Sequence, residues 1–291
     1  MAVLVSVIIP ACDAEATLPQ AVASLRAQRW QEWEALIVAD DARDYAALLG
    51  AQGLADARLR FLATGGIRTG CHRARNVGLA QARGALVDML DADDLFHPDR
   101  LATLAPLALT HGAAADNLAV VAEATEAPLY RVMGARAAAA RVDIAGLLAL
   151  TAPLVPLVRR EHALPRLDGV EYAEDVIGNL RLIDRLGPLP VVAESLYEYR
   201  VMPGSIAHDD RAAAAFDAAY AGYVARLERG DGLGLAPANR AVAARGMAAK
   251  RALNQDFARA QAAAPALNFQ TFVAARRANA NEASVGRSAP P

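Results

Sequence analysis

Short apolar runs alternate with amphipathic segments along the first part of the chain. Such runs are typical of strands buried on both faces of a parallel sheet, and they predict strands at residues 3–9, 35–39, 59–63 and 85–90. Helix signals lie between the runs. Thr17 and Gln20 have the spacing of a capping box, and Gly84 closes an amphipathic segment that begins at Cys71. The alternation predicts an α/β fold with a doubly wound, mostly parallel sheet and flanking helices.

The second half of the chain is less regular, with weaker apolar runs that predict strands at residues 118–122, 154–158 and 191–193. One helix is clear: Val176, Leu180 and Ile183 keep helical spacing, and Gly187 ends it. From about residue 211 the chain is rich in alanine and carries apolar stripes at helical spacing. We therefore expect three parts: an α/β domain at 1–210, a helical C-terminal extension at 211–278 and a disordered tail at 279–291.

Composition narrows the classes of partner. Thirty basic and 32 acidic residues give a net charge of −2, so no global positive field would recruit nucleic acid. Cys12 and Cys71 follow no disulfide or metal spacing, which suits a reducing compartment, and we expect both to be small buried residues. The first residues lack a charged leader, and no apolar run approaches the ~20 residues of a membrane span. These features predict a cytoplasmic protein and leave open peripheral contact with the inner face of the membrane.

The predicted strand at residues 85–90 runs straight into an acidic cluster, Asp91, Asp93 and Asp94, and contains Asp88 itself. Two carboxylates spaced D-x-D at a strand end can face one side of a turn, where a divalent cation would offset their desolvation. Ligation by oxygen alone selects Mg2+ or Mn2+ over Zn2+, and such an ion can neutralise a diphosphate. A D-x-D in isolation is at least as often a polar loop that caps the next helix.

Two further acidic pairs favour the metal-site interpretation of the D-x-D over the capping loop. Asp40 and Asp41 end another predicted strand, and Glu174 and Asp175 open the predicted helix that follows. Ligands of doubly wound sheets gather at the carboxyl ends of the strands, so acidic groups at these positions favour a shared site over unrelated loops.

Five blocks of the sequence then resemble family 2 glycosyltransferases of the GT-A fold. They are "VSVIIPACDAEATLPQAVASLRAQ", "WEALIVADDARD", "GCHRARNVGLAQARGALVDMLDADD", "YAEDVIGNLRLI" and "YEYRVMPGSIAH", in the family's order, and they cover about residues 3–208. The resemblance implies a metal-dependent, inverting enzyme that moves a sugar from a nucleotide-diphosphate sugar to a hydroxyl of a glycan or lipid-linked acceptor, in surface polysaccharide biosynthesis. It leaves a homodimer open.

The resemblance also implies which residues meet the donor. Relatives commonly bind a UDP-sugar at the ends of the first strands, which points to Pro10 and to Asp91, the latter at the ribose. Asp91 and Asp93 would hold Mn2+ or Mg2+. The residue that recognises the base aligns with Asp40, and Asp41 is the second choice.

Five more residues follow from matching motifs. Arg75 and Asn76 belong to an Arg-Asn-x-Gly segment that lies beside the nucleotide in relatives; the alternative is a helix with a basic outer face. Asp175 would deprotonate the acceptor hydroxyl, and its alternative is a carboxylate that stabilises a helix N-terminus. Arg200 would clamp the diphosphate. His208 would approach the metal or phosphate, or else be an exposed loop histidine.

Two departures weaken the predicted recognition of the base. Cys12-Asp13 stands where relatives usually have Tyr-Asn, and Asp41-Ala42 stands where they usually have Gly-Ser after the paired Asp. A haloacid-dehalogenase-type phosphatase also has D-x-D after a strand, but Leu95 occupies the place of its usual Thr or Val. A non-catalytic donor-binding module of the same fold is the other alternative, and it would be expected to have lost an acidic motif.

Overall fold

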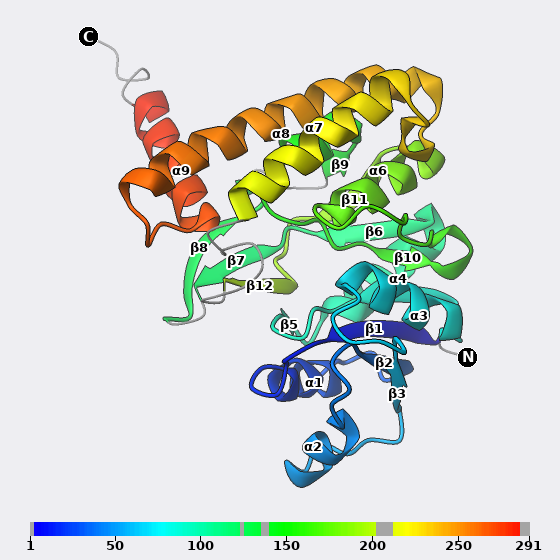
Figure 1. The fold of residues 1–291 in the computed structure, drawn as a ribbon. Helices are drawn as coiled ribbons and strands as arrows, with labels where there is room; N and C mark the ends of the chain where they lie inside the picture. The colour runs from blue at the N-terminus through cyan, green and yellow to red at the C-terminus, as the bar shows by residue number, and fades with distance from the viewer. Residues whose placement is uncertain (1–2, 123–124, 135–139, 202–211, 286–291) are drawn as a thin grey trace.

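The computed structural model describes residues 3–122, 125–134, 140–201 and 212–285 (Figure 1). Within this part the larger sheet has eight strands. In spatial order they are β3 (Leu59–Ala63), β2 (Trp33–Ala39), β1 (Val5–Ala11), β4 (Leu86–Met89), β10 (Leu157–Arg159), β6 (Ala113–Asp116), β11 (Leu189–Val192) and β9 (Ala140–Val142). The predicted α/β class is confirmed.

The sheet has a parallel half and a mixed half. β3, β2, β1 and β4 are parallel neighbours, as the four apolar runs predict. β10 is antiparallel to both β4 and β6, and β11 is parallel to β6 but antiparallel to β9. The carboxyl ends of β1, β2 and β4 therefore meet at one edge, which brings the first two acidic clusters to the same side of the molecule.

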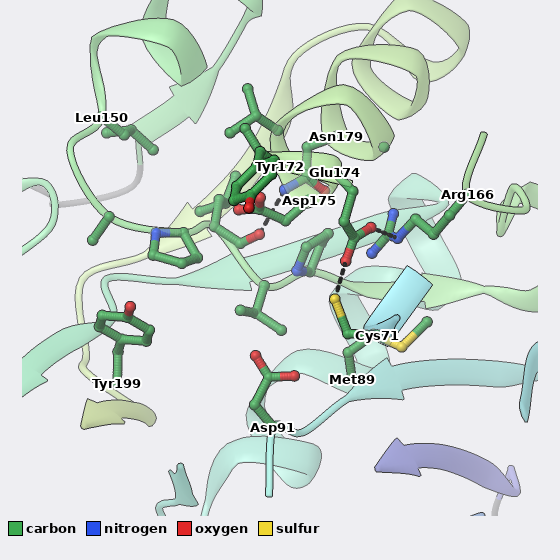
Figure 2. Close-up of a pocket in the computed structure, with 18 of the residues that line it drawn as sticks. Cys71, Met89, Asp91, Leu150, Arg166, Tyr172, Glu174, Asp175, Asn179 and Tyr199 are labelled. Carbon is green, nitrogen blue, oxygen red and sulfur yellow. Dashed lines mark hydrogen bonds and ion pairs between the residues drawn. The ribbon is translucent and has the colours of Figure 1, made fainter. Parts of the chain in front are cut away.

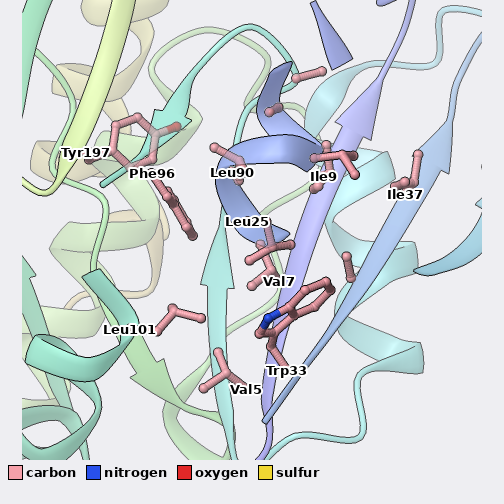
Figure 3. Close-up of a cluster of buried hydrophobic side chains, with 14 of the residues drawn as sticks. Val5, Val7, Ile9, Leu25, Trp33, Ile37, Leu90, Phe96, Leu101 and Tyr197 are labelled. Carbon is pink, nitrogen blue, oxygen red and sulfur yellow. The ribbon is translucent and has the colours of Figure 1, made fainter. Parts of the chain in front are cut away.

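Alternate residues of the parallel strands bury opposite faces of the sheet, because successive side chains of a strand point to opposite sides. Val7 and Ile9 of β1 pack in the cluster shown in Figure 3, under α1 (Leu18–Arg26) and α4 (Arg100–His111). Ile8 points to the other face, under α3 (Cys71–Gln81). There the absent side chain of Gly78 lets α3 approach, since a Cβ would lie 2.5 Å from Ile8.

A smaller sheet joins the acidic loop to the later part of the chain. In the described residues its order is β5 (Leu95–Phe96), β12 (Tyr197–Val201), β7 (Ala119–Ala122) and β8 (Ala127–Arg131). β5 follows the acidic cluster directly and pairs with β12, Phe96 opposite Tyr197. A segment about a hundred residues further along the chain therefore fixes the loop that carries the D-x-D residues.

Most of the remaining helices form a second core against the mixed half of the sheet. They are α5 (Ile144–Ala149), α6 (Glu174–Leu186), α7 (Ala212–Arg229), η4 (Gly232–Gly234) and α8 (Pro237–Ala263). α2 (Tyr45–Ala51) packs in the first core at the parallel end, α9 (Phe269–Val285) contacts β8 and Phe257 of α8, and η2 (Arg160–His162) is a short turn after β10. Figure 1 shows α7 and α8 side by side above α6. No helix of the described residues is both long and apolar enough to cross a membrane.

Two local expectations are wrong. Thr17 does precede α1, but its side chain makes no capping hydrogen bond, and Gln20 instead accepts one from Arg200 Nη1 at 2.7 Å. A tertiary partner has thus replaced the capping box. The C-terminal helix α9 continues to Val285, so residues 279–285 are helical where a disordered tail was expected. The proposed division of the chain at residue 210 stays a prediction.

Candidate active site

The four acidic residues at the end of β4 divide into two pairs with different tasks. Asp88 lies inside the sheet and Asp94 is buried behind the loop, and both carboxylates are bonded to other groups of the protein. The Oδ2 atom of Asp94 accepts a hydrogen bond from the Tyr197 hydroxyl at 2.7 Å, and its Oδ1 accepts one from the Arg200 amide at 2.8 Å. These bonds tie the loop to β12. Asp91 and Asp93, the predicted ligands, remain at the open side.

Asp88 is held by a buried arginine that the sequence analysis did not single out. Arg100 Nε lies 3.1 Å from Asp88, and its Nη1 contacts Asp116. Asp116 Oδ2 also accepts hydrogen bonds from the amides of Leu196 and Tyr197, at 2.7 and 2.9 Å. Burial raises the pKa of Asp88, and the Arg100 charge opposes that rise. This triad joins β4, α4 and β6 and fixes the start of β12.

Asp93 is a half-buried carboxylate whose charge is only partly offset by the more distant Arg200 and Arg75. Burial, then the nearby charge of Asp91, raises its pKa to about 6. Within the described residues no other side chain forms a hydrogen bond or ion pair with the Asp93 carboxylate. A partly buried pair of carboxylates with this imbalance fits a divalent cation, because a positive charge would offset both burial and mutual repulsion. The donor set, two aspartate oxygens, suits Mn2+ or Mg2+ and leaves coordination positions for phosphate and water.

The second acidic motif stands at the start of α6. Ala173 precedes the helix with φ 52°, in the left-handed region, and Glu174 and Asp175 occupy the first turn. Glu174 is buried and Asp175 is partly exposed, and both line a cavity of about 380 Å³ together with Asp91. In Figure 2 the Asp91 carboxylate points up from the end of β4 into the space below Asp175 and Tyr172. Residues 84 positions apart thus face the same space.

An arginine links the two acidic motifs. Arg75 of α3 contacts Asp91 through Nη2 and Glu174 through Nη1. Although burial opposes the charged form, the Asp91 carboxylate raises the pKa of Arg75. Glu174 also pairs with Arg166, whose Nε lies 2.6 Å from Oε2. Burial and then the Arg75 charge lower the pKa of Arg166 to about 10. Two guanidinium groups therefore share one buried glutamate beside the cavity.

Asn76 anchors Arg166 rather than lining the cavity. Its Nδ2 donates to the Arg166 carbonyl at 3.0 Å, and its Oδ1 accepts from the Arg166 amide at 2.7 Å. Gly178 of α6 leaves room for the Arg166 side chain, since a Cβ there would lie 1.9 Å from a guanidinium nitrogen. In this structure Asn76 and Gly78 hold α3 against its neighbours, a role that the expected position beside a nucleotide did not include.

The cavity is lined mainly by apolar and aromatic side chains from both halves of the chain. Loop residues Leu150 and Leu154, α6 and its approach at Tyr172, and the C-terminal helices all contribute, among the latter Phe216 and Tyr220 of α7. The hydroxyls of Tyr199 and Tyr220 make no hydrogen bond within the described part of the chain, and both residues line the cavity together with Asp91. Aromatic faces and uncommitted hydroxyls around a carboxylate suit a ligand that is part apolar and part polyhydroxylated.

The residues predicted to recognise the base lie apart from this cavity, at the ends of β1 and β2. Asp40 accepts hydrogen bonds from the Thr64 and Thr69 hydroxyls, both at 2.6 Å, and from the Gly70 amide at 2.9 Å. Despite burial, these bonds lower the pKa of Asp40. Asp40 thus fixes the loop that leads into α3.

Asp41 belongs to an exposed ionic group at the same strand ends. It accepts a hydrogen bond from the Tyr45 hydroxyl at 2.6 Å, and Arg43 pairs with both Asp41 and Asp13. Cys12, Asp13 and Asp41 could place three ligand atoms within 4.8 Å of one another. Arg43 and Arg68 already pair with these two carboxylates, whereas the Asp93 carboxylate has no ion pair within the described residues.

The other predictions have mixed outcomes. Pro10 is half-buried within β1 and pairs with Val38. Arg200 is buried behind the acidic loop, where its side chain meets Gln20. His208 lies outside the described residues. The expectation that both cysteines are buried is wrong: Cys12 and Cys71 are exposed, and Cys71 Sγ lies 3.9 Å from Glu174 Oε1 at the cavity.

Sequence reasoning missed Arg166, Arg100 and Lys250, all of which are structurally prominent here. Arg166 and Arg100 lie in unremarkable stretches, and no spacing rule connects them with their carboxylates. Lys250 had one available signal: the chain contains no other lysine.

The first part of the chain is similar to known glycosyltransferases. Residues 6–136 match the model of a family described as glycosyl transferase family 2. Escherichia coli WfgD, a UDP-Glc:alpha-D-GlcNAc-diphosphoundecaprenol beta-1,3-glucosyltransferase, is 33% identical over 98 residues, 34% of this chain and 38% of WfgD. The succinoglycan biosynthesis protein ExoO of Rhizobium meliloti is 36% identical over 119 residues, 40% of this chain and 34% of ExoO. The aligned segments thus span little more than a third of either relative.

Solved structures extend the likeness to nearly the whole chain. S. aureus TarS, residues 1–349 in complex with UDP-GlcNAc, superposes with a TM-score of 0.66 over 93% of this chain and 79% of that one, at 17% identity. GalNAc-T7 with UDP, GalNAc and Mn2+ gives a TM-score of 0.54 over 69% of this chain and 44% of that one, at 16% identity. At these identities the likeness shows the fold, and the fold implied by the sequence resemblance is confirmed.

Proposed function

We propose, from the membership of residues 6–136 in glycosyl transferase family 2, that this protein is a metal-dependent, inverting glycosyltransferase. It moves a sugar from a nucleotide-diphosphate donor, with UDP-sugars favoured, to a hydroxyl of a glycan or lipid-linked acceptor in polysaccharide biosynthesis. The relatives and the UDP-bound structures of similar fold support this class of donor. The observation that carries the proposal is that Asp91 and Asp175 face one cavity and are connected through Arg75 and Glu174.

Asp175 is the proposed base. Its carboxylate accepts the proton of the acceptor hydroxyl as that oxygen attacks the anomeric carbon from the face opposite the diphosphate. The bond between the anomeric carbon and the diphosphate oxygen breaks, and the nucleoside diphosphate leaves with its electron pair. Because Asp175 and Asp91 approach the cavity from different elements, α6 and the end of β4, they suit opposite faces of the transferred sugar.

Asp91 and Asp93 are the proposed holders of Mn2+ or Mg2+, which when bound would neutralise the charge that develops on the leaving diphosphate. Arg75 supplies a fixed positive charge beside Asp91. We assign recognition of the base to Asp40 or Asp41 and donor contacts to Pro10, near the ends of β1 and β2. Arg200 and His208 stay candidates for the diphosphate and the metal. In the proposed division, residues 1–210 bind the donor, and the helices after residue 211 line the part of the cavity that receives the acceptor.

The test combines UDP-, GDP- and dTDP-sugars with Mn2+, Mg2+ or a chelator, and measures release of nucleoside diphosphate and transfer to octyl glycosides. We expect release with a UDP-sugar that depends on the metal. Asp175→Asn should lower transfer by about 10²- to 10⁴-fold, the range of general-base catalysis, and leave donor binding intact.

Asp184→Asn is a matched control, because Asp184 lies on the same helix and bonds to Asn239 and the Ala236 amide, remote from the cavity lining. Near-normal transfer by Asp175→Asn would show that Asp175 is not the base. Phosphate release from a phosphomonoester without any action on nucleotide sugars would refute the proposed function.

A further inference from the structure

The cavity contains the single lysine of the chain. The sequence has 30 basic residues, and all except Lys250 are arginines. Lys250 stands on α8 and lines the cavity together with Asp175, Phe216 and Tyr220. The C-terminal helices therefore contribute one charged group to a wall that is otherwise uncharged, in which the amides of Asn254 and Gln270 lie among apolar and aromatic side chains.

The Lys250 ammonium group has only part of its hydrogen bonding satisfied. Its Nζ donates to the Leu150 carbonyl at 2.6 Å, and Leu150 is also part of the cavity lining. An ammonium group has three N–H donors. Within the described residues Nζ forms no ion pair with a carboxylate and no other hydrogen bond. Donors thus remain available for a ligand.

The electrostatic setting favours a negatively charged partner. Burial lowers the pKa of Lys250 to about 8, and the charge of Asp175 only partly opposes this. An anion beside Nζ would stabilise the ammonium form more than Asp175 does, because a close opposite charge favours ionisation. The surrounding aliphatic and aromatic side chains, among them Leu253 and Phe257 of the same helix, suit an apolar body rather than a fully hydrated ion.

We propose that Lys250 is an anion-binding, specificity-determining residue of the acceptor site, and that the acceptor carries a negatively charged phosphate or carboxylate group on an apolar body. Calling this ligand the acceptor rests on the proposed glycosyltransferase function; the binding site itself rests on the cavity. The shared chemistry is a charged head beside Lys250 and an apolar portion against the walls formed by α7 and α8. The acceptor hydroxyl then lies toward Asp175.

The first test measures binding alone, by calorimetry on the full chain and below the critical micelle concentration of each probe. The probes are octyl phosphate, nonanoate and octyl β-glucoside, which share an alkyl chain and differ in the head group. We expect the wild-type protein to prefer octyl phosphate or nonanoate over the neutral glucoside by about 10- to 100-fold, the range of a charged hydrogen bond. Whichever of octyl phosphate and nonanoate binds more tightly shows whether the site prefers a phosphate or a carboxylate head group.

Two variants keep the size of the side chain. Lys250→Met should bind the anionic and neutral probes alike, and Lys250→Arg should keep most of the preference for the anion. Circular dichroism checks that both variants are folded. Equal binding of charged and neutral probes by the wild-type protein, or an unchanged preference in Lys250→Met, would overturn the proposal.

The second test uses the uniqueness of the lysine. Reductive methylation with formaldehyde and borohydride can modify only Lys250 and the terminal amine, which peptide mass spectrometry separates. Octyl phosphate should protect Lys250 and leave the terminal amine unprotected; equal modification of Lys250 with and without the probe would contradict the site. Neither test involves turnover. Binding without action on any nucleotide sugar would therefore refute the proposed function and not the anion site, and the reverse result would refute only the anion site.

Discussion

Two arginines of this protein are each held between two carboxylates, and the two clusters differ in what lies beside them. Arg100 stands between Asp88 and Asp116, and the side chains are 0%, 0% and 1% exposed. Arg75 stands between Asp91 and Glu174, where Asp91 is 37% exposed and faces the cavity. The first cluster is closed on all sides, and the second opens onto the proposed active site.

The difference shows how one kind of interaction serves structure in one place and chemistry in another. Arg100 also lies over the rings of Phe96 and Tyr197, at 4.7 and 5.0 Å, so its charge is enclosed by protein. Beside the open cluster, the Asp93 carboxylate has no ion pair within the described residues and its pKa is raised, and Arg166 has a lowered pKa. A buried ion pair is costly to break in either place, but only the open cluster can exchange a protein partner for a ligand.

The largest loss of stability is expected when the arginine of the closed cluster, Arg100, is removed. Arg100→Leu leaves Asp88 and Asp116 buried without a cation, and we expect the free energy of unfolding to fall by about 3–5 kcal/mol. Urea denaturation followed by circular dichroism measures this loss. A loss no greater than that of a surface arginine, such as Arg229→Leu, would show that the triad is not a structural centre.

Removing the shared carboxylate of the open cluster should have a smaller effect on stability. Glu174→Gln leaves Arg75 and Arg166 without their common counter-charge, but both can reach solvent or cavity water, so we expect about 1–3 kcal/mol. Transfer should also fall, by about 10- to 100-fold, because Glu174 orients the groups around Asp91 and the start of α6. Urea denaturation measures the loss of stability, and kinetics at saturating donor measure the loss of transfer.

Glu174→Asp serves as the control in that experiment, since it keeps the charge on a shorter side chain. It should regain part of the stability. If Glu174→Gln changed stability without altering turnover, Glu174 would be a structural residue only.

Arg75→Leu is the counterpart of Arg100→Leu in the open cluster, and the two variants allow the stability contributions of the two arginines to be compared directly. Asp91 can be hydrated and Glu174 keeps Arg166, so the free energy of unfolding should fall by only about 1 kcal/mol. Metal-dependent turnover should nevertheless drop by at least about 10-fold. A stability loss as large as that of Arg100→Leu would mean that the two clusters do not differ in kind.

The smallest effect concerns pH. The pKa of Asp93 is about 6 in the folded protein, above its ordinary value, so the folded state binds more protons than the unfolded state between about pH 4 and 6. The contribution of Asp93 to the free energy of unfolding should therefore fall as pH rises through this window and stay constant above it. Asp93→Asn should remove that part of the pH dependence, and Mn2+ should reverse it in the wild-type protein. Identical denaturation profiles for wild type and Asp93→Asn over this range would exclude the shift.

Much of the fold follows from local patterns in the sequence. The apolar runs locate β1 to β4 within two residues. β1, β2 and β4 are buried on both faces and are therefore largely apolar along their length, whereas β3 is an edge strand in which Phe61 and Ala63 are exposed. The helical spacing before Gly187 likewise locates α6. The order of the acidic motifs is also local information, which is why the family could be recognised before any contact was known.

The sequence by itself determined the parallel half of the sheet and the resemblance to glycosyl transferase family 2, and it singled out Asp91, Asp93 and Asp175 as candidates for the proposed site. Only the tertiary structure decided that Asp88 and Asp94 serve the interior, that Glu174 meets Arg75 across 99 positions of the chain, and that the single lysine stands in the same cavity. The physical reason is that periodicity records which face of an element is buried. The partner of a buried charge depends instead on how distant elements pack, and neighbouring residues carry no trace of that packing.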